Sequence, residues 1–106
     1  MVVLIKGIKF SIKLLSKKDY IKKHSDKEYA HLDRYTKKLV FRQDFVTKKI
    51  IIHEVTHAFI ATLGLGSCNE LSVEDFEEII CEMLEDHLMD INKVSNDILS
   101  FLKESK

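Results

Sequence analysis

Two histidines four residues apart, with a glutamate directly after the first, constrain the fold of this chain more than any other feature. They are His53, Glu54 and His57, and they stand in a strongly apolar stretch. In an α-helix, positions i and i+4 lie on one face, one turn apart. Imidazole and carboxyl groups are costly to bury without partners. We therefore expect an amphipathic helix whose two histidines share a partner.

The helix that carries the motif is expected to run from Phe45 to about Leu63. Asp44 is a suitable N-cap, and Gly64 is a natural terminator. The β-branched run Ile50-Ile51-Ile52 is a weak helix former by itself. Tertiary packing must therefore support this helix.

The N-terminal half has β patterning around one short helix. Residues 2–14 are rich in apolar side chains, which alternate with polar ones over 8–13. This pattern predicts a half-buried strand. Ser16 opens a capping pattern for a basic helix to about Lys23, and a second such pattern at 25–28 suggests another short helical piece. Residues 29–43 contain two β-prone runs around a turn, which predicts a β-hairpin.

The sequence pattern predicts helices in the C-terminal half. Ser72 begins a capping-box pattern, and an acidic amphipathic helix follows it. Asp90 or Asn92 is expected to cap a separate last helix. The order strand, helix, hairpin, helices predicts an α+β fold. With 106 residues, we expect a single domain in which a small antiparallel sheet packs on the motif helix and the acidic helix.

The chemistry of the motif suits a metal ion. Two imidazoles one turn apart can both reach one Zn²⁺ ion at about 2.0–2.1 Å. Glu54 projects beside the ion, where it can accept a proton from a water molecule and deliver it to a leaving amine. The alternative is that these three side chains only form the solvent-exposed face of an amphipathic helix. We favour the metal site.

A catalytic zinc site needs a third protein ligand, and the acidic helix offers several. Catalytic zinc usually has three protein ligands and one open position. Ile60 stands where a histidine-rich extension of the motif would have glycine. The candidates are therefore carboxylates after Ser72, namely Glu74, Glu77, Glu78, Glu82 and Glu85.

The segment resembles the gluzincin branch of zinc peptidases. In that branch the third ligand is a glutamate about twenty residues after the second histidine, followed by a carboxylate four later. Glu78 lies 21 residues after His57, and Glu82 lies four beyond it. The resemblance implies His53, His57 and Glu78 as metal ligands and Glu82 as the group that orients a histidine. Glu77 and Glu82 are the competing ligands.

A wider resemblance covers the layout of most of the chain, although the specific match is confined to residues 50–85. The chain looks like the minimal HExxH zinc metallopeptidases of phages and mobile elements, related to the ImmA/IrrE group. This implies peptide-bond hydrolysis by zinc-activated water, with Glu54 as general base, on a protein or peptide substrate. The alternative is a catalytically silent zinc-binding module for protein interaction or regulation, because no oxyanion donor is identified.

Charge and hydropathy limit the classes of binding partner that we expect. Residues 1–50 contain 14 Lys or Arg against 5 Asp or Glu, and residues 51–106 contain 3 against 12. A basic half can bind nucleic acid. We favour mutual neutralisation of the two halves, because the basic residues are scattered. No apolar run reaches the ~20 residues of a membrane span, and no signal peptide is visible. We expect a cytoplasmic protein without membrane contact.

Three further histidines have less definite roles. His31 falls in the expected hairpin beside the motif helix, where it could contact substrate, although a surface position is favoured. His24 is expected to be solvated. His87 falls on the apolar stripe of its helix and is expected to be a core histidine with satisfied hydrogen bonds.

Overall fold

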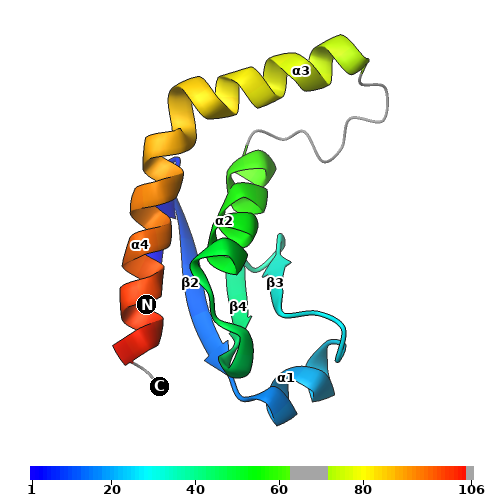
Figure 1. The fold of residues 1–106 in the computed structure, drawn as a ribbon, viewed down its shortest axis with the longest axis vertical. Helices are drawn as coiled ribbons and strands as arrows, with labels where there is room; N and C mark the ends of the chain where they lie inside the picture. Colours follow the sequence, from blue (N-terminus) through cyan, green and yellow to red (C-terminus); the bar gives the residue numbers. More distant parts are fainter. Residues whose placement is uncertain (63–71, 105–106) are drawn as a thin grey trace.

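The fold is an α+β arrangement of one mixed sheet and the helices that cover it. The computed structural model describes residues 1–62 and 72–104. The four strands follow the order β1-β2-β4-β3, and α2 and α4 lie side by side over one face of the sheet (Figure 1). The elements are β1 (Val2–Ile5), β2 (Ile8–Leu15), α1 (Lys17–Lys23), β3 (Ala30–Asp33), β4 (Lys38–Arg42), η1 (Gln43–Phe45), α2 (Lys48–Thr62), α3 (Val73–Glu82), η3 (Met83–His87) and α4 (Leu88–Glu104).

The N-terminal strand predicted over 2–14 is in fact a hairpin. Strands β1 and β2 pair antiparallel, with Ile5 opposite Ile8. The two residues between them, Lys6 and Gly7, have φ angles of 51° and 78°. Positive φ at both central positions matches the tight turn whose twist suits a two-residue hairpin. Gly7 adopts this conformation without a side-chain penalty.

The sheet is mixed, so the predicted antiparallel sheet is wrong. Strand β2 pairs parallel with β4, with Ile12 opposite Leu39. The hairpin predicted over 29–43 is confirmed, since β3 pairs antiparallel with β4. Parallel pairing joins segments that are distant in sequence, and only a crossover connection can produce it. Strands β1 and β3 form the two edges of the sheet.

Helix α2 begins at Lys48, later than the predicted start at Phe45. The hydroxyl oxygen of Thr47 accepts a hydrogen bond of 3.2 Å from the amide of Ile50, so Thr47 is the cap. The carboxylate of Asp44 instead accepts two hydrogen bonds from the Arg42 guanidinium, at 2.8 and 3.0 Å. The prediction of Asp44 as N-cap is therefore wrong, and the predicted end at Leu63 and Gly64 lies outside the described residues.

One side of α2 supplies the centre of the core. Its buried side chains lie at the spacing of a helix face and pack with apolar side chains from the sheet and from α4. The residues of the motif fall around the rest of the helix circumference. The most enclosed members of this core are Ile5, Phe10, Leu39, Phe41, Ile51, Val55, Ala58, Phe59, Ile98 and Leu102.

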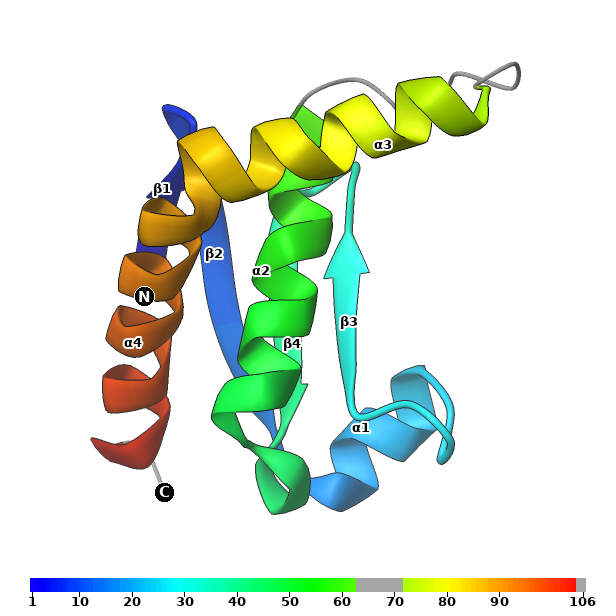
Figure 2. The same ribbon diagram turned by 45° about the horizontal axis from the view of Figure 1, so that its top comes forward.

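From Val73 to Glu104 the chain is one helical path with a π turn within it. The predicted capping box at Ser72 is confirmed, with reciprocal hydrogen bonds of 3.1 Å to the amide and carboxylate of Asp75. The prediction of a new cap at Asp90 or Asn92 is wrong, because α3 passes through η3 into α4. The path bends near this π turn, and α3 runs past the C-terminal end of α2 (Figure 2).

Among the described residues, no helix is long and apolar enough to cross a membrane.

Candidate metal centre

The two histidines of α2 are arranged as a pair of metal ligands would be. Their Nε2 atoms lie 3.1 Å apart, and their ring planes are inclined at 78°. Two ligands placed tetrahedrally at 2.0–2.1 Å from a zinc ion would be separated by about 3.3 Å. His53 is exposed and His57 is half-buried, so solvent reaches the pair. This separation fits a zinc ion bound through both Nε2 atoms.

Glu54 lies beside the pair and is half-buried. Burial raises the pKa of its carboxyl group above the ordinary value, while His57 and His53 act in the opposite direction. A carboxyl group with a raised pKa accepts and returns protons closer to neutral pH. Glu54 also lines a cavity of about 470 Å³ with His53, Glu28 and Tyr29. The predicted base therefore faces a space that a substrate could enter.

The predicted third ligand lies on another element than the two histidines. Glu78 lies on α3 and is exposed, as are Glu77 and Glu82. Within residues 1–62 and 72–104, no carboxylate of α3 joins both α2 histidines in a group whose ligand atoms lie within 4.8 Å of one another. The structure thus brings His53, Glu54 and His57 together, and Glu78 as a ligand stays a prediction.

A second group of metal-ligating side chains lies on the same side of the molecule as the cavity. His24, Glu28 and His31 each offer one ligand atom, and these atoms lie within 4.8 Å of one another. His24 ends α1 as its C-cap, Glu28 is in the following loop, and His31 belongs to β3. His24 is half-buried, so its side chain is less solvated than expected.

Aromatic and hydrogen-bonding contacts connect this second group. The rings of His24 and His31 have centroids 4.8 Å apart, and His31 Nδ1 is 3.8 Å from Glu28 Oε2. The hydroxyl of the buried Tyr20 donates to the same carboxylate oxygen at 3.5 Å. Burial, reinforced by His31, lowers the pKa of His24. Its imidazole is therefore biased to the neutral form that binds metals.

Arg42 fastens the loop that carries Glu28. Its side chain is 4% exposed, and its Nη1 donates to the backbone oxygens of Asp26 and Glu28 at 3.1 and 3.3 Å. Asp44 engages the other two guanidinium nitrogens, and the ring of Phe45 lies 4.9 Å from the guanidinium carbon. The sequence did not point to Arg42, because the backbone oxygens of Asp26 and Glu28 are distant in sequence and no local pattern reveals contacts with them.

The spacing of His24, Glu28 and His31 was a weak signal for the second group. Positions i, i+4 and i+7 share one face of a helix. The capping pattern at 25–28 suggested a helical piece there, but these residues form a loop. The three side chains converge because the chain leaves α1, turns and enters β3, and not because of helical spacing.

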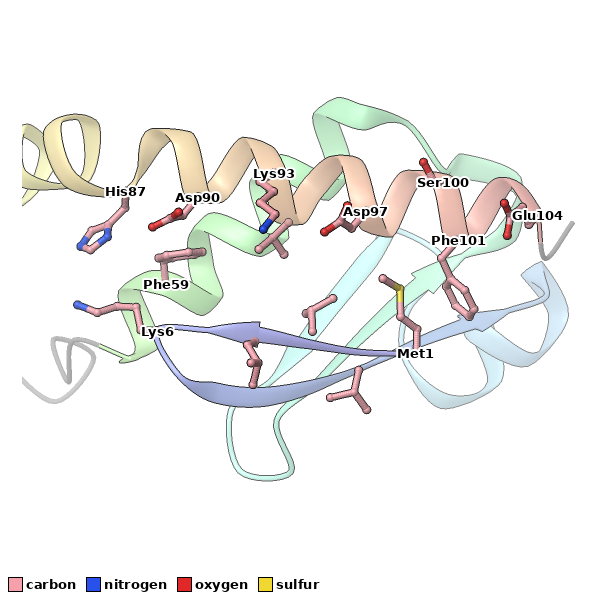
Figure 3. A pocket seen from close by; sticks show the side chains of 14 residues that line it. Met1, Lys6, Phe59, His87, Asp90, Lys93, Asp97, Ser100, Phe101 and Glu104 are labelled. Carbon is pink, nitrogen blue, oxygen red and sulfur yellow. The ribbon is translucent and has the colours of Figure 1, made fainter.

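The hollow between β1 and α4 is larger, at about 960 Å³, but it does not contain the motif. Figure 3 shows His87, Asp90 and Lys93 on its α4 side and Lys6 on its β1 side. The ring of His87 lies 5.6 Å from that of Phe59, and its Nε2 is buried without a hydrogen-bond partner among the described residues. His87 is therefore not the satisfied core histidine that its position in the sequence suggested.

Comparisons of this chain with protein-family models, with curated proteins and with solved structures found no match.

Proposed function

We propose that this protein is a zinc-dependent peptidase in which His53 and His57 hold the metal and Glu54 transfers protons. The observation that carries the proposal is the 3.1 Å separation of the two Nε2 atoms, with the carboxyl group of Glu54 next to them. A zinc ion shared by two histidines requires their ligand nitrogens to lie this close together.

The chemistry divides between the metal and the carboxylate. When bound, zinc lowers the pKa of a water molecule and polarises a peptide carbonyl. As the water oxygen bonds to the carbonyl carbon, Glu54 accepts one of its protons. Glu54 returns that proton to the amine nitrogen as the C–N bond breaks. Burial, which raises its pKa, makes Glu54 a stronger base and so favours the step in which it accepts the proton.

An extended peptide is the substrate that the surroundings of Glu54 best accommodate. Among the described strands, β3 pairs only with β4, so its outer edge has backbone groups that can pair with another strand. The cavity at Glu54 is lined by Glu28, Tyr29 and Ala30 at the start of this edge strand and by Thr47 and Ile50 of the facing helix turn. A peptide along the edge would pass this cavity.

Glu78 remains our choice of third ligand, on the strength of the gluzincin-like spacing alone. Its carboxylate makes no hydrogen bond or ion pair to the described residues, so it is available to an ion. Glu77 and Glu82 are the alternatives. The zinc content of Glu78→Ala and Glu77→Ala variants distinguishes Glu78 from Glu77 as the ligand. Only the loss of a true ligand weakens zinc binding strongly.

Glu54→Gln tests the mechanism. The amide keeps the shape of the side chain but cannot accept the proton, so hydrolysis is expected to fall by about 100-fold or more while zinc content stays unchanged. The measurements are the cleavage rate of a peptide library and zinc analysis of the same sample. Glu104→Gln, an exposed change on α4, is the matched control. Equal cleavage by wild type and Glu54→Gln would contradict the mechanism.

A second candidate function is a zinc-binding interaction or regulatory module without turnover. It is favoured by the exposure of Phe76 and Ile80 on α3 and of Leu84 on η3, at 52, 59 and 58%. Within the described ranges, α3 also brings no carboxylate to the α2 histidines. Exposed apolar groups on an acidic helix suit a protein partner. Stoichiometric zinc, a tightly bound partner protein and no cleavage of that partner would support this function over the peptidase.

A further inference from the structure

We propose that His24, Glu28 and His31 form a second metal site, which takes a divalent transition-metal ion such as Zn²⁺. The site is separate from the histidine pair of α2. Its three ligand atoms, one from each residue, already lie within 4.8 Å of one another. Ligands of a tetrahedral zinc ion are separated by about 3.3 Å, so small side-chain rotations suffice to close the group around an ion.

The donor set selects the kind of ion. Two imidazoles and one carboxylate form a ligand set that zinc uses when it keeps one position open. Calcium and magnesium prefer oxygen ligands throughout, so two imidazoles disfavour them. The side chains of His31 and Glu28 are 41 and 46% exposed. An ion can therefore enter from solvent, and a further ligand can reach it.

The backbone positions of the three ligands are fixed before any ion arrives. The amide of His24 donates to Tyr20 O at 2.9 Å, and the amide of Arg42 donates to Tyr29 O at 3.1 Å. The Arg42 guanidinium holds the carbonyl oxygen of Glu28, and His31 is paired opposite Val40 in the sheet. Fixed backbones reduce the conformational entropy lost when the ion binds.

Charges around the group permit a cation. The positive charge of Arg42 is engaged by the carboxylate of Asp44 through two hydrogen bonds. The Tyr20 hydroxyl orients the carboxylate of Glu28, in the way that outer partners commonly orient metal ligands.

The location gives the ion access to the proposed reaction space. Glu28 lines the same cavity as His53 and Glu54. A cation bound by Glu28 would therefore lie at the wall of that cavity. Binding of an ion by these three residues does not require that the protein hydrolyse peptides.

Zinc titration of the full chain by calorimetry, with metal analysis, tests the proposal. Wild type is expected to bind about two zinc ions per chain. The His24→Ala/His31→Ala variant and the His53→Ala/His57→Ala variant are each expected to bind about one, and the fourfold variant none. Wild-type stoichiometry and affinity in the His24→Ala/His31→Ala variant would overturn the second site. One ion in wild type that only this variant loses would support it and contradict the zinc site on α2.

Matched single changes keep the test independent of folding. Glu28→Gln is expected to weaken the second binding event at least about tenfold. Asp26→Asn removes the same charge from the same loop and is expected to leave affinity unchanged. Circular dichroism checks that each variant is folded. In histidine NMR spectra of the wild type, zinc should shift the His24 and His31 ring signals, and unchanged ring signals at saturating zinc would overturn the proposal.

Discussion

At the scale of single residues, Arg42 connects the loop that carries Glu28 to the sheet. It is a buried cation that contacts two loop carbonyls, one carboxylate and two aromatic rings. Through these contacts one strand residue orders the loop that carries Glu28. The physical reason is that a guanidinium has five donors in a fixed plane, which can satisfy several acceptors at once.

Asp44→Asn should make stability less dependent on pH in the acid range. Hydrogen bonds from Arg42 are the main cause that lowers the pKa of Asp44 below its ordinary 3.8. A carboxylate with a lowered pKa stabilises the fold above its unfolded pKa, and the effect is lost as pH falls through the folded value. Wild type should therefore exceed Asp44→Asn in unfolding free energy at pH 7, and the difference should shrink below about pH 4.

Urea unfolding followed at several pH values measures this difference. Asp97→Asn is the control, since Asp97 is exposed on α4 and is expected to show little difference at any pH. A difference between wild type and Asp44→Asn that grew as the solution became more acidic would contradict the role of the Arg42 contact.

At the scale of elements, the buried face of α2 decides where the motif points. The helix begins after Thr47. The hydrophobic spacing of Ile51, Val55 and Phe59 then sets which face is buried. The direction of the two histidines follows from this burial, because they occupy the rest of the helix circumference.

Thr47→Ala should destabilise the protein by about 1 kcal/mol, the usual cost of losing a side-chain N-cap. The amide of Ile50 would lose the acceptor that lies 3.2 Å away. Thermal and urea unfolding measure the change. Ser100→Ala, an exposed mid-helix change on α4, is the control and should cost nothing, since alanine is the better helix former. Equal stability of wild type and Thr47→Ala would show that the hydroxyl is not the cap.

At the scale of the whole molecule, the core and α3 differ sharply in how much surface they bury. The core joins the sheet, α2 and α4, whereas α3 makes its main contacts with the neighbouring turn η3. The aromatic rings of Phe59 and Phe76 illustrate the contrast, being 2 and 52% exposed. Apolar burial is the main source of folding stability, so the two regions should respond very differently to truncation.

Phe59→Ala should lower the unfolding free energy by about 3–5 kcal/mol, the range for a large buried side chain. Phe76→Ala, its matched counterpart on α3, should cost less than about 1 kcal/mol. Chemical denaturation of both variants under one condition makes the comparison. A large loss for Phe76→Ala would mean that α3 packs against the core in solution.

Local patterns were enough to predict much of this protein. The helix with His53, Glu54 and His57, the capping box at Ser72 and the β3–β4 hairpin all follow from interactions within a few residues. The pairing of the two Nε2 atoms belongs with them, because helical spacing alone brings i and i+4 together. These features could be predicted because neighbours in sequence decide them.

Only the tertiary structure decided the rest. Parallel pairing of β2 with β4, the Arg42 contacts, and the convergence of His24, Glu28 and His31 each bring together residues from different elements. Such contacts depend on how the chain closes its loops and packs its core, and no local spacing encodes them. The sequence by itself therefore determined the motif helix and the pairing of its two histidines, whereas packing decided what surrounds them.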